Sequence, residues 1–99
     1  FETPAILHNA GIKICITADH DVTPLYYLAV YAGVAVRYGL NELEGLKAVT
    51  INPAEILGID DRKGQLKVGL DADIVIWSDH PFSCKALPEQ VFIEGKQML

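Results

Sequence analysis

The sequence is poor in cysteine, in basic residues and in long hydrophobic runs, and each shortage excludes a class of protein. Cys15 and Cys84 are the only cysteines, and one lies inside an apolar run, so reduced thiols are expected rather than a disulfide framework. We therefore predict a cytoplasmic protein. Lysine and arginine number 8 against 13 acidic residues. Because no basic cluster is available to neutralise phosphates, nucleic acid and anionic membranes are poor candidate partners.

The longest apolar run, residues 25–36, is too short to span a bilayer, which takes about 20 apolar residues. It predicts a buried helix instead. What remains is the composition of one ordinary globular domain, 51% hydrophobic and 21% charged. Small molecules or other proteins are the partners that this composition favours.

One stretch, residues 11–20, joins an apolar run to a polar ending. Its isoleucines occupy even positions and its more polar residues occupy odd positions up to Asp19, as the two-residue period of a strand requires. In an α/β fold the isoleucine face packs under helices, and sites lie at the carboxyl ends of strands. Asp19 is therefore a candidate site residue. From spacing alone an equal alternative stands, in which Asp19 or Asp21 caps the helix that follows.

Helices are predicted over most of the first 58 residues, each opened by a capping residue or a proline. The expected ranges are 3–10, 25–38, 42–49 and 53–58, and the expected caps are Thr3, Thr23, Asn41 and Asn52. Gly58 is the expected stop of the last helix. The second helix is apolar nearly all round, so it must be covered on several sides.

The character of the chain changes near residue 59, where a charged turn leads into a segment rich in glycine and β-formers. Strands are expected at 65–68, 72–77, 91–93 and 96–99. The second of these is apolar enough to be buried on both faces, and the last two form a hairpin through Glu94-Gly95. Asp71 and Asp73 are interpreted as turn residues rather than a carboxylate pair. We predict two parts, 1–58 and 59–99.

A single strand between helices cannot pair its own backbone, and unpaired buried N–H and C=O groups are costly. The first 58 residues look like one slice of a parallel barrel or sheet, and a barrel takes about 250 residues. Two expectations follow. Either the chain is a piece of a larger protein, or it completes its sheet with another copy in a tight or swapped homo-oligomer.

Four stretches, in this order, resemble the carboxyl-terminal part of the metal-dependent amidohydrolases, in particular the branch related to imidazolonepropionase. They are Ile12–His20, Ala48–Gly58, Gly64–Trp77 and Val91–Lys96. The resemblance implies an α/β fold in which residues 1–58 are the terminal βα portion of a TIM-like barrel, with Ile12–Ala18 as its eighth strand. Residues 59–99 would supply strands of a small composite β-sandwich built from both chain ends.

The resemblance also implies a role for Asp19 as a catalytic residue and metal ligand. In the family, the acid that closes strand eight binds the catalytic metal and handles the proton of the water that hydrolyses a C–N bond of a cyclic or linear amide. A carboxylate suits this work, because one oxygen can face a cation while the other accepts a proton. The implied cofactor of the complete enzyme is a divalent metal, zinc by expectation, and the implied partner is a small-molecule amide substrate.

The sequence departs from a complete enzyme in its histidines. The family's His-x-His pair has no counterpart, and His8, His20 and His80 form no metal-ligand spacing. In an extended segment His20 and Asp19 would point to opposite faces, so they could not ligate one ion together. His20 is then either a loop histidine or a residue that contacts substrate or supports the metal ligands from behind.

We therefore expect the chain alone to be inactive. The rival hypothesis is a non-catalytic remnant or assembly domain, stable only as an oligomer or with a complementing chain. The two hypotheses differ in what precedes Phe1: a His-x-His pair ending a predicted strand favours the enzyme.

Overall fold

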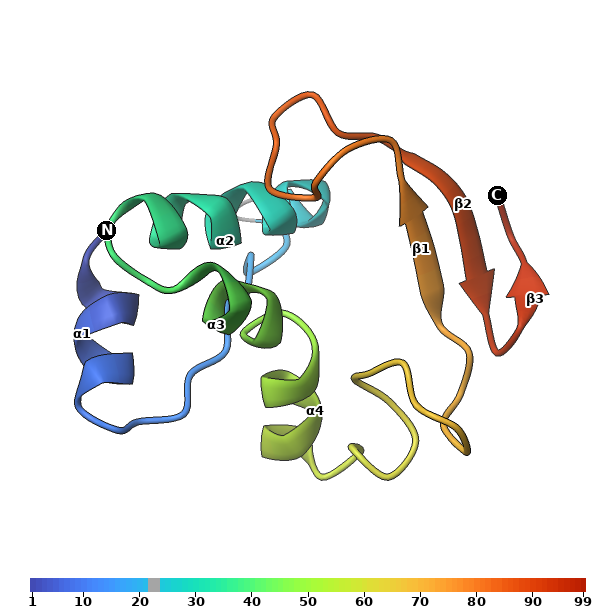
Figure 1. The fold of residues 1–99 in the computed structure, drawn as a ribbon, viewed down its shortest axis with the longest axis horizontal. Helices are drawn as coiled ribbons and strands as arrows, with labels where there is room; N and C mark the ends of the chain where they lie inside the picture. Colours follow the sequence, from blue (N-terminus) through green and yellow to red (C-terminus); the bar gives the residue numbers. More distant parts are fainter. Residues whose placement is uncertain (22–23) are drawn as a thin grey trace.

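A computed structural model describes residues 1–21 and 24–99, with the helices in the first part of the chain and the strands in the last (Figure 1). The elements are α1 (Thr3–Asn9), the 3-10 turn η1 (Leu25–Tyr27), α2 (Leu28–Arg37), α3 (Glu42–Lys47), α4 (Ile51–Leu57), β1 (Ile74–Trp77), β2 (Pro88–Ile93) and β3 (Lys96–Gln97). This mixture of helix and strand is consistent with the predicted α/β class. None of the helices in the described ranges is long and apolar enough to cross a membrane.

The predicted helices form, with a 3-10 turn at the start of the second, but the predicted caps of the first and the last are wrong. Helix α1 includes Thr3, with Glu2 at its N-cap and no capping bond from a side chain, so the predicted Thr3 cap is wrong. Helix α4 begins at Ile51, which places Asn52 inside the first turn instead of at the cap. Pro53 is tolerated there because the first N–H groups of a helix have no helical partner.

Caps at the other helix ends agree better with the sequence. The Asn41 side chain accepts the N–H of Leu43 at 2.9 Å and so caps α3, as predicted. Glu44, three residues after Asn41, faces basic side chains in a cavity described below. Gly58 ends α4 with a φ of 75°, in the left-handed conformation that a stop requires. The predicted Thr23 cap lies outside the described residues.

Two predicted strands, 12–18 and 65–68, are not strands in the described part of the chain. The sheet there contains β1, β2 and β3 in that order, all antiparallel. In the described residues no strand of this sheet lies beside residues 12–18. Because a β-strand is defined by backbone hydrogen bonds to a neighbouring strand, this segment is extended chain and not a strand. In the second segment Leu66 is 78% exposed and Val68 is fully exposed, so burial does not support a strand there either.

The predicted hairpin is confirmed. Strands β2 and β3 are joined by Glu94 and Gly95, whose φ values of 52° and 80° are both positive, as a type I′ turn requires. Strand β1 was predicted to be buried on both faces, and this is wrong for the chain as it stands. Val75 and Ile76 are 42% and 44% exposed, because the sheet extends away from the helices (Figure 1).

The core consists of small side chains. Its buried apolar residues are Ala5, Ala18, Ala32, Ala35, Leu40, Ala48 and Ala54, and no large side chain in the described ranges is fully buried. The accessible surface is 6955 Å², whereas a compact monomer of this mass would expose about 5,500 Å². The second predicted helix was expected to be covered on several sides, but its Tyr26 and Val30 remain exposed. Much apolar surface is thus left uncovered.

The loop between β1 and β2 holds the sheet to the helices. Phe82 in this loop lies close to two helical glycines: a Cβ atom at Gly33 would be 3.2 Å from the Phe82 Cβ, and one at Gly45 would be 3.2 Å from its ring. Beside it, the His80 Nε2 lies 3.0 Å from the Glu42 carboxylate. The absence of side chains at these two helix positions therefore lets Phe82 approach α2 with its Cβ and backbone and α3 with its ring.

Charged side chains fix the connection between α4 and β1. The Lys63 Nζ lies 2.7 Å from the Asp73 carboxylate and 3.0 Å from that of Asp71, which also lies 3.0 Å from the Arg62 guanidinium. The other Asp73 oxygen accepts the backbone N–H of Glu94 at 2.9 Å. Asp71 and Asp73 lie beside a turn and at the entry to β1, as predicted, and both bind the Lys63 ammonium group. They tie the connection to the hairpin turn.

These contacts shift the titration of all three groups. Hydrogen bonding to Lys63 lowers the pKa of both carboxyl groups below 3.8, helped at Asp73 by the Glu94 N–H, and bonding to Asp73 and Asp71 raises the Lys63 pKa above 10.5. A carboxyl group whose pKa is lowered by folding stabilises the fold at pH values above its pKa in the unfolded chain. This stabilisation is lost as the pH falls through the pKa of the group in the folded protein. A lysine whose pKa is raised by folding stabilises the fold at pH values below its pKa in the unfolded chain. This stabilisation is lost as the pH rises through the pKa of the lysine in the folded protein.

We therefore expect the hairpin turn to be held best between about pH 4 and pH 10. Peptide-level amide hydrogen exchange, corrected for intrinsic rates, should show protection of residues 93–96 falling outside that window. Asp73→Asn should lower the protection a few-fold at neutral pH and remove most of its acid dependence. Asp61→Asn, in the exposed turn of the same connection, is the matched control and should change neither. Wild-type protection in the Asp73 variant would contradict the role of these ion pairs.

Candidate active site

From residue 13 to residue 19 the segment shows the predicted alternation of side chains even without a strand partner, whereas Ile12 is exposed. Ile14 and Ile16 pack against the core formed by Ala5, Ala35 and Leu40. Ala18 is buried as well, whereas the odd-numbered side chains are exposed, namely Lys13, Cys15, Thr17 and Asp19. The segment therefore presents one face to the helices and leaves the other open, and Asp19 ends the open face.

The α3–α4 corner holds this segment by its backbone. The Ile16 N–H donates to the Ala48 carbonyl at 2.9 Å. Two residues earlier, the Ile14 carbonyl accepts a hydrogen bond from the Asn52 side-chain amide, also at 2.9 Å. These bonds fix which part of the segment lies over the helices, so they decide where Asp19 emerges.

Asp19 lies in a turn at the end of the segment, with an exposed side chain and a positive φ of 52°. Its backbone N–H reaches the Thr17 hydroxyl at 3.4 Å, a long contact. The alternation of an extended strand does not continue past this point. The prediction that Asp19 and His20 cannot ligate one ion together assumed an extended segment, in which their side chains would face opposite ways. That assumption does not hold in this turn.

His20 caps the 3-10 turn that follows. Its Nδ1 accepts the Leu25 N–H at 3.1 Å, and its Nε2 lies 3.4 Å from the Asp21 carboxylate. The predictions gave this capping role to Asp19, Asp21 or Thr23, whereas in the described residues His20 receives the bond. Both ring nitrogens thus face groups of the same loop, which leaves the Asp19 carboxylate as the more available side chain.

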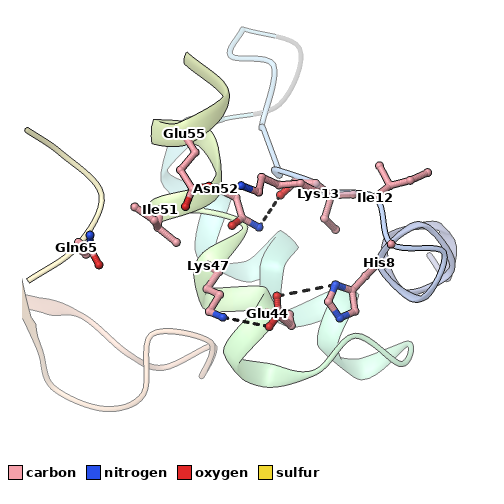
Figure 2. Close-up of a pocket in the computed structure, with 11 residues that line it drawn as sticks. His8, Ile12, Lys13, Glu44, Lys47, Ile51, Asn52, Glu55 and Gln65 are labelled. Carbon is pink, nitrogen blue, oxygen red and sulfur yellow. Dashed lines mark hydrogen bonds and ion pairs between the residues drawn. The ribbon is translucent and has the colours of Figure 1, made fainter. Parts of the chain in front are cut away.

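A cavity of about 490 Å³ opens at the other end of the segment, beside Gly11 and Ile12 (Figure 2). Its charges are paired: Glu44 lies 3.3 Å from the Lys47 Nζ and 3.9 Å from the His8 Nδ1, and Lys13 pairs with Glu55. Since α/β sites lie at the carboxyl ends of strands, we interpret this cavity at the amino end as structural, lined by ion pairs that join α1 to α3 and residue Lys13 to α4.

Asp19 is the metal ligand predicted from the sequence. Among the described residues, no three His, Cys, Asp or Glu side chains lie close enough together to hold an ion. The other two histidines face partners of their own, because His8 lies near Glu44 and the His80 Nδ1 accepts the Phe82 N–H at 3.1 Å. A catalytic zinc takes three protein ligands, so these residues do not fit a complete centre, and no reaction step through a metal follows from them.

The model of the amidohydrolase family matches residues 2–98, and the chain belongs to that family. Amidohydrolase tasK of Hapsidospora irregularis is 36% identical over 90 residues, which cover 91% of this chain and 9% of that protein. The imidazolonepropionase of Psychromonas ingrahamii is 42% identical over 80 residues, 77% of this chain and 20% of that one. The predicted resemblance is therefore confirmed.

A solved structure of an amidohydrolase from Thermotoga maritima MSB8 matches with a TM-score of 0.95 and 46% identity, covering 99% of this chain and 26% of that chain. A second structure, of an uncharacterized protein, matches with a TM-score of 0.78 and 25% identity. The chain thus spans about a quarter of the amidohydrolase it matches. The family is generally metal-dependent.

The sequence did not predict the structural roles of Asn52 and Lys63. Asn52 was read as a cap because it precedes a proline, yet it is inside α4 and only 9% exposed. The sequence could have indicated this role only in part: an asparagine that is buried in a helix needs a hydrogen-bond partner elsewhere in the protein. For Lys63, the charged turn gave no indication that two later carboxylates would meet it.

Proposed function

We propose that this chain is the carboxyl-terminal portion of a metal-dependent amidohydrolase that hydrolyses a C–N bond in a cyclic or linear amide. The observation that carries the proposal is the position of Asp19, an exposed carboxylate at the end of a segment whose opposite face packs on helices. The family match over residues 2–98 supports it. The rest of the site would come from outside these residues.

In this proposal residues 1–58 form the terminal βα portion of a TIM-like barrel. The segment 12–18 becomes its eighth strand when a neighbouring strand pairs with the backbone groups that the α3–α4 corner does not already bind. Residues 59–99 contribute to a small composite β-sandwich, which would cover the exposed side chains of β1. The uncovered apolar surface of the chain supports both assignments, because each supplies a layer that the isolated chain lacks.

The part of the chemistry that falls to this chain is the handling of a proton. A bound divalent metal, proposed to be zinc, would supply Lewis acidity. Asp19 would be the ligand that this chain contributes to the metal, and its carboxylate takes a proton from the attacking water and passes it to the leaving nitrogen. His20 keeps the turn after Asp19 in place through its bond to Leu25, and we propose that it supports the site in this way or by contacting substrate.

The substrate class proposed is a small cyclic or linear amide, in keeping with the imidazolonepropionases among the relatives. We place the protein in the cytoplasm, where a reducing environment suits its two exposed free thiols, Cys15 and Cys84. Residues 1–99 alone are proposed to be inactive.

A second candidate is a non-catalytic assembly domain, and the large exposed apolar surface favours it. The experiment that separates the two is an assay of the protein made from its complete reading frame. Metal content and hydrolysis of a panel of cyclic and linear amides should both be positive for the enzyme. A start codon at or just before Phe1, with no metal bound and no hydrolysis, would support the assembly domain instead.

A further inference from the structure

Asn52 is the one polar residue classed as buried in the described ranges, and its amide is aimed at the backbone of the segment that carries Asp19. It lies in the first turn of α4, and its Nδ2 donates to the Ile14 carbonyl 38 residues earlier in the chain. Figure 2 shows this bond running from α4 to the segment. A buried amide without such a partner would be strongly unfavourable.

The bond works together with a second one. In extended chain, backbone groups of residues i and i+2 point to the same edge, so the Ile14 carbonyl and the Ile16 N–H face the same neighbour. That neighbour is the α3–α4 corner, through Asn52 and the Ala48 carbonyl. The corner thus occupies the place of a pairing strand over these two residues.

We propose that Asn52 is a positioning residue for the reaction: it fixes the register of residues 12–18 on the helices and thereby the place of the Asp19 carboxylate. This inference rests on the proposed function of Asp19. Ile14 and Asp19 are five residues apart, about 17 Å of extended chain, and extended chain does not stretch. A register shift at Ile14 is therefore passed on to Asp19, and a misplacement of about 1 Å can lower a rate about 10²-fold.

The test uses full-length protein carrying Asn52→Leu, which keeps the side-chain size and removes the donor. We expect kcat per folded molecule to fall about 10- to 100-fold, with KM changed less than about threefold. Asn41→Ala is the matched control. It removes an exposed helix contact, the cap of α3, without touching residues 12–18, so it should lower the Tm and leave kcat per folded molecule unchanged.

Asn52→Asp gives a readout that a purely structural role would not produce. An ionised carboxylate cannot donate to the Ile14 carbonyl, but a protonated one can, and burial raises the pKa of a carboxyl group. The ratio of kcat for Asn52→Asp to kcat for Asn52→Leu should therefore rise several-fold as pH is lowered. If the leucine variant does not fold, the ratio of the aspartate variant to wild type is followed over the same pH range.

Wild-type kcat per folded molecule in Asn52→Leu, with only the Tm lowered, would overturn the inference. So would a pH-independent ratio for Asn52→Asp. Asp19→Asn is measured in parallel to separate the two proposals. If that variant is fully active the proposed function fails, whereas an inactive Asp19 variant beside an unaffected Asn52→Leu overturns the positioning role alone.

Discussion

Asp19→Asn in the full-length protein should abolish hydrolysis and leave the fold intact. The substitution is unusually safe for folding, because asparagine is among the residues that best tolerate the left-handed backbone that Asp19 adopts, with φ at 52°. The side chain is exposed, so no core contact is lost. The amide cannot take up a proton, and loss of the proton transfer alone should lower kcat about 10²- to 10⁴-fold.

Asp21→Asn is the matched control for this prediction. Asp21 is also exposed and also has a positive φ, 67°, and it lies two residues further along the same turn. The control therefore makes the same change of side chain and charge, at an exposed position with the same kind of backbone conformation. We expect it to keep nearly wild-type kcat.

Three measurements decide the outcome: kcat, metal content per protein and the Tm. The Asp19 variant should lose kcat and bind less metal at an unchanged Tm. Activity retained above about a tenth of wild type would refute the assigned role, since general acid–base catalysis contributes at least about 10²-fold. An equal loss in both variants would point to the charge of the turn rather than to Asp19 itself.

Residues 1–99 expressed alone should self-associate and show no hydrolase activity. The chain exposes 6955 Å² of surface, about 1,400 Å² more than a compact monomer of its mass, and a stable protein interface buries about 1,200–2,000 Å² in total. Leu66, Val68 and Leu57 are among the apolar side chains that stay more than 70% exposed. Surface of this kind is removed from water by association when no other cover is available.

Sedimentation velocity at several concentrations measures this directly. We expect a concentration-dependent distribution of species larger than the monomer. Co-expression with the Thermotoga maritima amidohydrolase from which the matching quarter has been deleted should instead give a defined complex, because the two structures agree with a TM-score of 0.95. A compact, stable monomer at all concentrations would contradict both the larger protein and the oligomer.

Local signals in the sequence were sufficient for the helices and the hairpin. Asn41 caps α3 and Gly58 stops α4 because each makes its contact within a few residues of itself. Glu94-Gly95 forms the turn for the same reason. The alternation of residues 12–18 was also readable, since it depends on which side chains are apolar and not on any partner strand.

Contacts over long sequence distances could not be read in the same way. Residues 12–18 and 65–68 have strand-like composition, but their backbone groups need neighbours that this chain does not supply. His20 took over a capping role because of how its turn folds, which spacing alone does not fix. Asn52 reaches Ile14 across 38 residues, and single-sequence patterns carry no information on such a pairing.

The contact of Phe82 with Gly33 and Gly45 has a consequence for recombining members of this family. A chimera joined near residue 59 would take Phe82 from one parent and the two glycine positions that make room for it, 33 and 45, from the other. A donor tail carrying an aromatic residue at 82 would then be crowded by any recipient that has a larger residue at 45, where even a Cβ atom would lie 3.2 Å from the Phe82 ring. Chimeras should therefore exchange residues 78–87 together with α2 and α3, as one cassette.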